Sequence, residues 1–287
     1  MITSIMVITK EKTNQPSNLR ENAIRQAKKI SLSPFNYCFL VYYHLIKEIK
    51  RNLHYAHGVF LDVGCGSSPC EYLFKPKVEK YLKHDHPDCA KPDINYEYLS
   101  ELPTIPAKDS SIDTVFCSSV LEHVSKPFEA LHEINRILKP NGILLLSVPQ
   151  YWHLHEEPHD YLRFTKYILK TKLEESRFEI ISIKELGGAF ATVGQVFCNA
   201  LVLMFDLEPV KNIFNFLSTK KTKNLGKSLI YALSRSPIIL LTFLLIPIIN
   251  LLFLCLDKLA GSPRDTIGYF VVAKKLGDRS EALGDRN

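Results

Sequence analysis

The chain has 287 residues, of which 46% are hydrophobic and 23% are charged, so it can bury a substantial core and is not expected to be disordered. Its formal net charge of +6 is modest for this length and is compatible with an anionic membrane surface or with nucleic acid. The seven cysteines are scattered and include no CxxC pair. This pattern argues against a disulfide framework or a thiolate zinc site and favours a reducing cytoplasm. No secretory signal is expected at the amino terminus.

The first part of the chain, residues 1–56, is expected to be a leader followed by a helical cap. Apolar residues recur at helical spacing from Pro34 to Leu53, which predicts one amphipathic helix. From residue 57 onward, short apolar runs of the kind found in buried strands replace this pattern. The runs are Val59–Val63, Tyr81–Leu82, Thr114–Cys117, Ile143–Val148, Phe178–Ile183 and Tyr269–Ala273.

Helical segments between these runs indicate an α/β fold. Pro127–Leu138 is one such segment, and the sequence Lys-Pro-Asn-Gly that follows it is a typical helix stop. Strands that alternate with helices form a mainly parallel sheet, which binds ligands at the carboxyl ends of its strands. We predict a core over residues 57–188, a last strand within 263–276 and a tail over 277–287.

An apolar and basic insertion, residues 189–262, separates the last two strands. Within it, Pro237–Leu256 has twenty residues without a charge, enough to span a bilayer. Both ends of the insertion are expected to enter one sheet, so it crosses a membrane twice or not at all. Two crossings would place the basic stretch Asp206–Ser236 outside, against the positive-inside tendency, and Pro247 is expected to divide the long run into halves too short to span. We therefore predict a re-entrant or interfacial hairpin whose basic stretch faces anionic head groups; a buried helical subdomain, a dimer interface and two full spans are the alternatives.

The first expected strand ends in a glycine turn that suits a ligand site. Asp62 is followed by Gly64 and Gly66, and glycines let the backbone approach a ligand while the next helix offers its amino end to a carboxylate. Pro69 stands where a dinucleotide fingerprint has its third glycine, which disfavours pyrophosphate binding. Asp85, about 20 residues further on, is placed to accept hydrogen bonds from two ribose hydroxyls.

Taken together, these motifs resemble the class I S-adenosylmethionine-dependent methyltransferase superfamily, in its small-molecule and quinone-type subgroup. The resemblance covers roughly residues 57–188 and resumes at 267–275. It implies that Asp62, Gly64 and Gly66 bracket the methionine end of S-adenosylmethionine, that Asp85 holds the ribose and that Ser118 lines the floor of the pocket. The segments that carry it are Phe60–Gly66, Asp85, Ser111–Cys117, Leu121–Val124 and Glu133–Gly142.

A histidine-rich segment, Tyr151–Thr165, follows the strand that ends near Val148 and is expected to lie above the pocket. Its His155 and His159, with His123 after the preceding strand, are candidates for a general base near neutral pH. The string around His159 resembles methyltransferases found near bacterial surface-polysaccharide and lipid-modifying enzymes. A purely structural role in fixing the loop is the alternative. The histidines lack a paired thiolate or an HExxH spacing, so no metal ion is expected.

The sequence therefore predicts a doubly wound, seven-stranded Rossmann-like methyltransferase sheet with a helical cap and an apolar helical insertion. The expected reaction is methylation, on oxygen before nitrogen or carbon, of an amphipathic or lipid-linked small-molecule acceptor at the cytoplasmic side of a membrane, or else in the cytoplasm. The rivals are a membrane-tethered nucleotide- or NAD-binding oxidoreductase and a non-catalytic binding protein of the same fold. No nucleic acid partner is expected, because no aromatic and basic stacking platform is evident.

Overall fold

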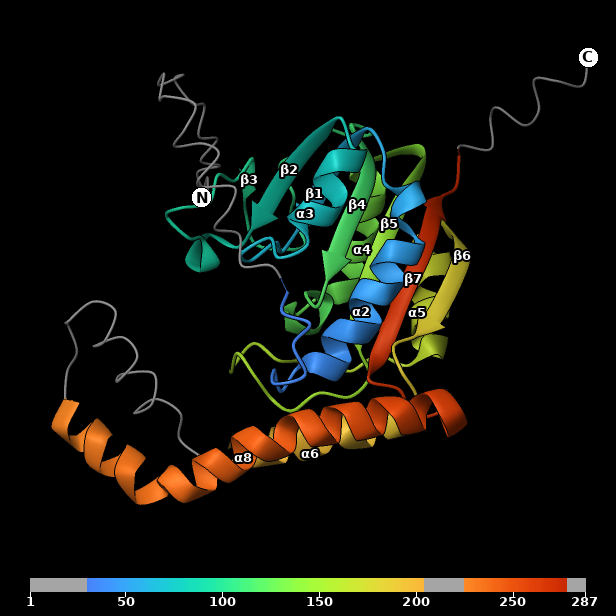
Figure 1. Cartoon of the computed structure of the whole chain (residues 1–287). Helices are drawn as coiled ribbons and strands as arrows, with labels where there is room; N and C mark the ends of the chain where they lie inside the picture. Colours follow the sequence, from blue (N-terminus) through green and yellow to red (C-terminus); the bar gives the residue numbers. More distant parts are fainter. Residues whose placement is uncertain (1–29, 204–224, 278–287) are drawn as a thin grey trace, which may run out of the picture. The chain divides into compact units, whose positions relative to one another are not determined.

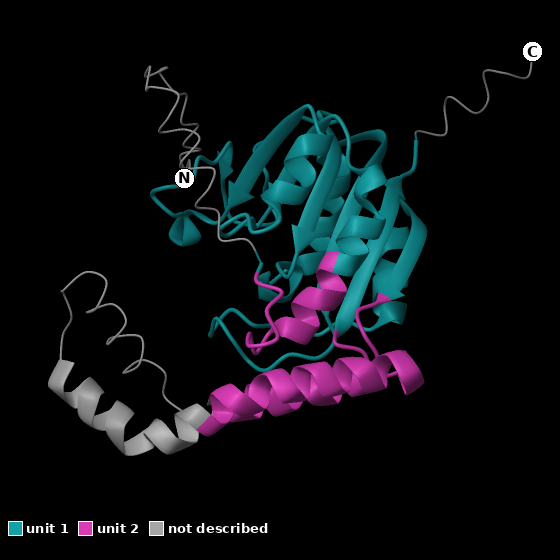
Figure 2. Ribbon diagram, in the orientation of Figure 1, with its two compact units in different colours: residues 1–30, 47–184, 268–287 teal, residues 31–46, 185–267 magenta. Residues whose placement is uncertain are grey.

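A computed structural model describes residues 30–203 and 225–277 of the chain. Most of the predicted leader, the tail from residue 278 and much of the basic stretch lie outside the described residues. The contacts divide the chain into two compact units (Figure 2). Unit 1 contains Lys47–Lys184 and the residues from Gly268 onward, and unit 2 contains Ser31–Ile46 and Glu185–Ile267.

Unit 1 is built on a seven-stranded sheet with the order β3-β2-β1-β4-β5-β7-β6 (Figure 1). β1 is parallel to β2 and β4, β2 to β3, and β4 to β5, whereas β7 is antiparallel to β5. All six expected strands are confirmed, and the seventh is the two-residue edge strand β3. The strands are β1 (Val59–Val63), β2 (Lys80–Asp85), β3 (Tyr98–Leu99), β4 (Ile112–Ser118), β5 (Leu138–Pro149), β6 (Phe178–Glu185) and β7 (Gly268–Lys275).

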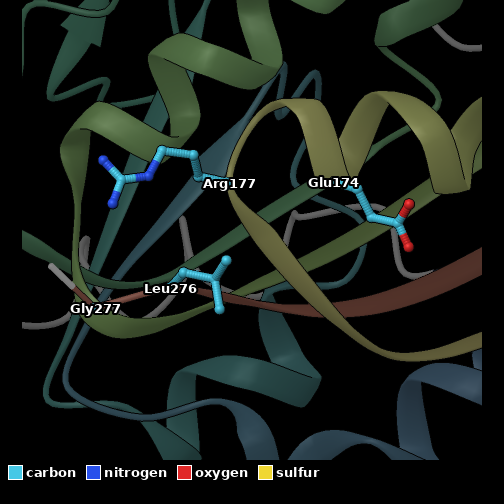
Figure 3. A pocket seen from close by; sticks show the side chains of 4 residues that line it. All are labelled: Glu174, Arg177, Leu276 and Gly277. Atoms are coloured by element: carbon cyan, nitrogen blue, oxygen red, sulfur yellow. The ribbon is translucent and has the colours of Figure 1, made fainter. Parts of the chain in front are cut away.

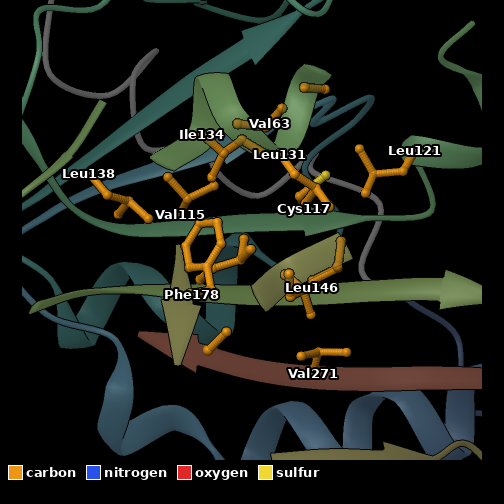
Figure 4. Packing of buried hydrophobic residues seen from close by; sticks show 14 of the residues in the cluster. Val63, Val115, Cys117, Leu121, Leu131, Ile134, Leu138, Leu146, Phe178 and Val271 are labelled. Atoms are coloured by element: carbon orange, nitrogen blue, oxygen red, sulfur yellow. The ribbon is translucent and has the colours of Figure 1, made fainter. Parts of the chain in front are cut away.

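Helices pack on both faces of this sheet, as the doubly wound prediction requires. Alternate strand residues point to opposite faces, so Leu61 and Val63 of β1 join the apolar cluster with α4 and α5, while Phe60 packs on the other face against Phe74 of α3. Figure 4 shows side chains of the larger cluster, among them Ile134 from α4. The helices described wholly within unit 1 are α3 (Glu71–Phe74), α4 (Pro127–Ile137) and α5 (Lys166–Glu175), with 3-10 turns η1 (Leu53–Tyr55), η2 (Lys75–Lys77), η3 (Pro87–Cys89) and η4 (Leu121–His123).

The described part of the insertion contains two apolar helices, α6 (Ala189–Leu203) and α8 (Leu225–Ala260), which lie side by side (Figure 1). The expected division of the long apolar run at Pro247 is wrong, because α8 continues through that residue. A proline removes one backbone hydrogen bond and adds a local clash, and the helix tolerates this loss. The cap helix α2 (Phe39–Arg51) begins five residues later than Pro34, and its first half clusters with the insertion in unit 2.

Polar side chains inside unit 2 tie its segments together. The fully buried Asn250 of α8 donates through Nδ2 to the carbonyl oxygens of Pro34 at 2.6 Å and Asn36 at 3.0 Å. The carboxylate of Asp257 accepts from the backbone N–H groups of Gly188 and Ala191, at 3.1 and 3.0 Å, and so caps the start of α6. These bonds satisfy backbone groups that burial would otherwise leave unpaired.

α8 has one buried stripe and one exposed apolar stripe. Thr242, Ile246, Asn250 and Leu254 recur every four residues and are buried, as expected for the side of a helix that packs on its neighbours. Among the described residues, the helical segment Leu241–Ala260 of α8 is the one that is long and apolar enough to cross a membrane. Only 17% of this segment is buried. Where the burial of unit 2 is described, its exposed large apolar side chains are Leu32, Phe35, Val193, Phe197, Leu241, Phe243, Leu244, Ile248, Leu251, Leu252 and Leu259.

Candidate active site

The turn after β1 contains two glycines, and their surroundings differ. Both adopt the left-handed conformation, Gly64 with φ +63° and Gly66 with φ +54°. A Cβ atom at Gly64 would lie 2.4 Å from Cγ2 of Val120, so packing leaves no room for a side chain there. A Cβ at Gly66 would meet no atom within 4 Å. Gly66 therefore borders open space at the carboxyl end of β1, where a parallel sheet binds its ligand.

Asp85 ends β2 beside this turn. Its Oδ2 accepts the Gly66 N–H at 2.9 Å and its Oδ1 accepts the His86 N–H at 2.9 Å, so the carboxylate is fixed in direction. Each oxygen keeps lone-pair capacity for a further donor. Tyr96, which the sequence analysis did not single out, accepts the Lys91 N–H at 3.0 Å and lies with its hydroxyl 3.5 Å from the Gly66 carbonyl oxygen.

Asp62 is 4% exposed and accepts a hydrogen bond of 2.6 Å from the hydroxyl of Tyr81. Burial raises the pKa of the Asp62 carboxyl to about 7, although the Tyr81 hydrogen bond and the charge of Lys83 act in the opposite direction. The group is thus a carboxyl that titrates near neutrality beside the glycine turn.

The carboxyl end of β4 supplies the next group of residues. Ser118 is the last residue of β4, pairs with Ser147 of β5 and is partly exposed, as a residue on the floor of a pocket would be. η4 follows directly and carries Glu122 and His123. Ser118 and η4 therefore occupy the same edge of the sheet as the glycine turn.

The structure brings two of the three candidate histidines together. Nε2 of His123 lies 3.1 Å from Nε2 of His155, and the rings meet edge to face. Nδ1 of His123 lies 2.7 Å from the carbonyl oxygen of His159. The His159 ring is exposed and its Nδ1 lies 3.0 Å from the Tyr161 hydroxyl, so His159 reaches the pair through its backbone and not through its imidazole.

Glu122 is a further candidate site residue. The sequence analysis named the segment Leu121–Val124, which contains it, but did not single out Glu122. It is 1% exposed, and among the described residues its Oε2 has no hydrogen-bond partner. Burial raises the pKa of its carboxyl to about 8. A ligand atom of Glu122 lies within 4.8 Å of ligand atoms of His123 and His155. The sequence signal that could have identified Glu122 is a glutamate next to a histidine shortly after a predicted strand.

An ion pair holds the histidine-rich loop in place. Arg163 donates to both carboxylate oxygens of Asp160, at 2.6 and 2.8 Å, and also to the carbonyl oxygens of Trp152 and His153. The guanidinium beside Asp160 holds the pKa of that carboxyl well below its usual range. This part of the loop has the structural role that the sequence analysis left open, and it positions His155 at the same time.

A separate surface cavity lies away from these residues (Figure 3). It is lined by Glu174, Arg177, Leu276 and Gly277. The last two follow β7, whose Lys274 pairs with Ile143 near the amino end of the parallel part of β5. The cavity is therefore at the opposite edge of the sheet from the glycine turn and is not part of the candidate site.

A protein-family model described as "Methyltransferase domain" matches residues 61–146. The matched segment includes the glycine turn, Asp85 and η4, and the sheet around it has its last strand antiparallel, as in that superfamily. The core of this chain is a class I methyltransferase domain. The match ends before the histidine-rich loop and before the insertion, so neither of these belongs to the part of the methyltransferase domain that the family model describes.

The methyltransferase domain has relatives with limited coverage. A protein of Methanocaldococcus jannaschii is 38% identical over 155 residues, which are 50% of this chain and 64% of that protein. A tRNA U34 carboxymethyltransferase of Campylobacter concisus is 28% identical over 113 residues, 34% of this chain and 38% of its own. The chain thus spans less than two thirds of these curated relatives. A solved S-adenosylmethionine-dependent methyltransferase of Archaeoglobus fulgidus has 17% identity and a TM-score of 0.47, over 80% of this chain and 93% of that one; this likeness carries no argument about function.

The cofactor of such methyltransferase domains is S-adenosylmethionine, and the residues at the glycine turn fit it. The space in front of Gly66 admits a ligand that a Cβ would displace. The fixed carboxylate of Asp85 can accept from ribose hydroxyls, and Asp62 supplies a carboxyl close to the expected methionine end. The predicted contacts of Asp62, Gly64, Gly66, Asp85 and Ser118 with the cofactor stay predictions.

Proposed function

We propose that this protein transfers the methyl group of S-adenosylmethionine to an oxygen of an amphipathic or lipid-linked acceptor. The observation that carries the proposal is that Gly66 and Asp85 share the carboxyl edge of the sheet with the paired histidines His123 and His155. This edge combines a place for the cofactor with polar groups for an acceptor. Positioning and exclusion of water supply much of the acceleration in such a displacement.

The cofactor and the chain's own residues have separate roles in this reaction. The bound cofactor supplies an electrophilic methyl group on a sulfonium. Transfer would form a bond from the acceptor oxygen to that methyl carbon and would leave the electron pair of the broken carbon–sulfur bond on sulfur. The acceptor's hydroxyl proton passes to an imidazole Nε2 of His123 or His155. His159 supports this arrangement by accepting the Nδ1–H of His123 at its carbonyl oxygen.

The acceptor class is supported by unit 2. Its exposed apolar side chains, such as Leu244, Ile248 and Leu251, form a face of α8 that water does not favour. The sequence between Asp206 and Ser236 is rich in lysine, which anionic head groups attract. We therefore infer that the hairpin of α6 and α8 lies at the cytoplasmic surface of an anionic membrane, where an amphipathic acceptor resides. α6, with 15 residues, is short for a second span.

The cofactor assignment is tested by titrating the detergent-purified chain with S-adenosylhomocysteine, the product of the cofactor, and with NADH in parallel. We expect saturable binding of the former and none of the latter. Asp85→Ala should weaken binding about 10- to 100-fold, the value of a charge-assisted hydrogen bond or two. Asp88→Ala is the matched control, because its side chain is 92% exposed in η3. Binding of NADH alone, or equal affinity in both variants, would refute the assignment.

The acceptor is tested by incubating the protein with methyl-labelled cofactor and three fractions: lipid extract, water-soluble metabolites and RNA. Label in the lipid fraction is the expected result. Label in RNA would favour an activity of the kind that the name of the Campylobacter concisus relative states, and label in the water-soluble fraction would remove the role proposed for the membrane.

Membrane association is tested by sedimentation with vesicles of anionic or neutral lipid. Leu244→Glu and Ile248→Glu replace side chains that are 52% and 60% exposed and should reduce the bound fraction. Tyr167→Glu is the control, because Tyr167 is 72% exposed on α5 of unit 1. Equal sedimentation of all three variants, or equal binding to the two lipids, would count against the interfacial hairpin.

A further inference from the structure

The imidazole rings of His123 and His155 at the candidate site face each other through their Nε2 atoms. Nδ1 of His123 lies 2.7 Å from the His159 carbonyl oxygen, and Nδ1 of His155 lies 3.2 Å from the His153 carbonyl oxygen and 3.3 Å from Oδ2 of Asp160. These oxygens only accept, so each Nδ1 carries a hydrogen and each neutral ring has only a lone pair at Nε2. Two lone pairs therefore point into one space across 3.1 Å.

A cation between the two Nε2 atoms would relieve the repulsion between their lone pairs. Imidazole nitrogens bind Zn²⁺ at about 2.0–2.1 Å, so two such ligands stand about 2.9–3.4 Å apart when the angle at the ion lies between a right angle and the tetrahedral value. The observed separation of 3.1 Å between Nε2 of His123 and Nε2 of His155 falls in that interval.

Glu122 supplies a third ligand and an independent reason for a cation. Its side chain comes from η4, next to His123, and it is 1% exposed. Among the described residues its Oε2 has no hydrogen-bond partner, although it lies with the two histidines in a group whose ligand atoms are all within 4.8 Å of one another. A buried carboxyl oxygen without a partner is costly, and a bound cation would supply that partner.

The surroundings also orient the ligands. The side chain of Asp160 is 1% exposed, accepts the backbone N–H of His155 at 3.1 Å and is held by Arg163. Its Oδ2 near Nδ1 of His155 directs Nε2 of that ring toward His123. A carboxylate behind a histidine ligand is a common arrangement in metal sites, because it fixes the ring and its tautomer.

We propose that Glu122, His123 and His155 bind one divalent first-row transition ion, with Zn²⁺ as the probe. Two imidazoles and one carboxylate suit such an ion better than Mg²⁺ or Ca²⁺, which prefer oxygen ligands. Three protein ligands leave a coordination position open to an oxygen ligand. The site was not expected from sequence because its ligands come from two loops, after β4 and after β5. The base role proposed above for His123 or His155 belongs to the metal-free protein, because an ion would occupy both Nε2 atoms. Any part of the ion in orienting an acceptor oxygen rests on the proposed methyl transfer, whereas binding itself does not.

The experiment uses the untagged full-length chain, freed of metal with a chelator. Zn²⁺ is titrated in competition with a chromophoric chelator, and Co²⁺ is added separately because its visible absorption reports nitrogen ligation. We expect one ion per wild-type chain and loss of stoichiometric binding in His123→Ala, His155→Ala and the nearly isosteric Glu122→Gln. Asp160→Asn should weaken binding about 10- to 100-fold.

His132→Ala is the matched control, because His132 is an exposed histidine on α4, and it should bind as the wild type does. Circular dichroism identifies any variant that fails to fold, and the Co²⁺ spectrum of the wild type tests the site without any substitution. Absence of stoichiometric Zn²⁺ and Co²⁺ binding by the wild type would overturn the proposal and leave a proton shared by the two imidazoles. Equal Zn²⁺ affinity in the wild type and the folded His123→Ala and His155→Ala variants would overturn it too.

Titration of the metal-free chain with S-adenosylhomocysteine separates this proposal from the proposed function. Cofactor-product binding without Zn²⁺ binding refutes only the metal site. Zn²⁺ binding that depends on the two histidines, without cofactor-product binding, supports the metal site while the methyltransferase assignment fails.

Discussion

Replacing Gly64 by alanine should destabilise the chain strongly. The residue has φ +63°, and the added Cβ would lie 2.4 and 2.8 Å from the two Cγ atoms of Val120. The left-handed conformation costs about 1–2 kcal/mol for a residue with a Cβ, and forcing a methyl group into a packed site costs about 1–3 kcal/mol more. We therefore expect the free energy of unfolding to fall by about 2–5 kcal/mol, and the melting temperature by about 4–20 °C.

Gly66→Ala is the internal control for this argument. Its φ of +54° carries the same conformational cost of about 1–2 kcal/mol, but its Cβ would meet no atom within 4 Å. The fold should therefore survive, whereas affinity for S-adenosylhomocysteine should fall, because the methyl group occupies the space proposed for the cofactor. Urea unfolding followed by circular dichroism measures the first effect, and calorimetric titration measures the second.

The double variant Gly64→Ala/Val120→Ala identifies the cause of the loss. Removing the two Cγ atoms should restore the packing part of the stability and leave the conformational part. Two results would refute the reasoning: equal destabilisation by Gly64→Ala and Gly66→Ala, or no recovery in the double variant. Full cofactor-product affinity in Gly66→Ala would refute the assignment of the open space.

Three further predictions concern other parts of the chain. The carboxyl of Asp62 has a pKa of about 7 in the folded chain against an ordinary value of 3.8, so its contribution to stability is fully present below about pH 4 and is lost as the pH rises through 7. In Asp62→Asn, the change in the free energy of unfolding over that pH interval should be smaller by about 4 kcal/mol. Urea titrations of the wild type and the variant at several pH values check this. Arg163→Met leaves the nearly buried Asp160 carboxylate unpaired, at a cost of about 3–5 kcal/mol, and should speed hydrogen exchange in the loop after β5 while exchange in the central strands stays unchanged. Asn250→Leu removes both donors to the backbone of residues 34–36, so limited proteolysis should cut that segment faster; an unchanged cutting rate would mean that these bonds do not anchor it.

Most of the sheet was predictable because its strands are short apolar runs between turn signals. Thr114–Cys117 and Ile143–Val148 are buried from both faces, so nearly every residue in them is apolar. β3 was missed because Tyr98–Leu99 is a two-residue edge strand with no periodicity to detect. α8 was divided in error because Pro247 is a local signal, whereas continuation of the helix depends on its packing against α6.

The candidate site was predictable only where its parts are close in sequence. Asp62, Gly64 and Gly66 lie in one turn, and Asp85 follows at a familiar spacing. The pairing of His123 with His155 depends on two loops that meet only because β4 and β5 are neighbours in the sheet. The different roles of His155 and His159 depend on which part of each residue faces His123, which no sequence pattern specifies.

The insertion interrupts the sheet between β6 and β7, and β7 lies between β5 and β6 in strand order. A ribosome therefore releases β5 and β6 first, then the whole apolar hairpin, and only then the strand that must pair between them. Until Gly268–Lys275 has been synthesised, the hydrogen-bonding edges of β5 and β6 have no partner from β7, and such edges are prone to wrong pairing. The order of synthesis thus completes the apolar hairpin before the sheet is closed, and any chain that stops short of its last strand retains the hairpin without a finished sheet.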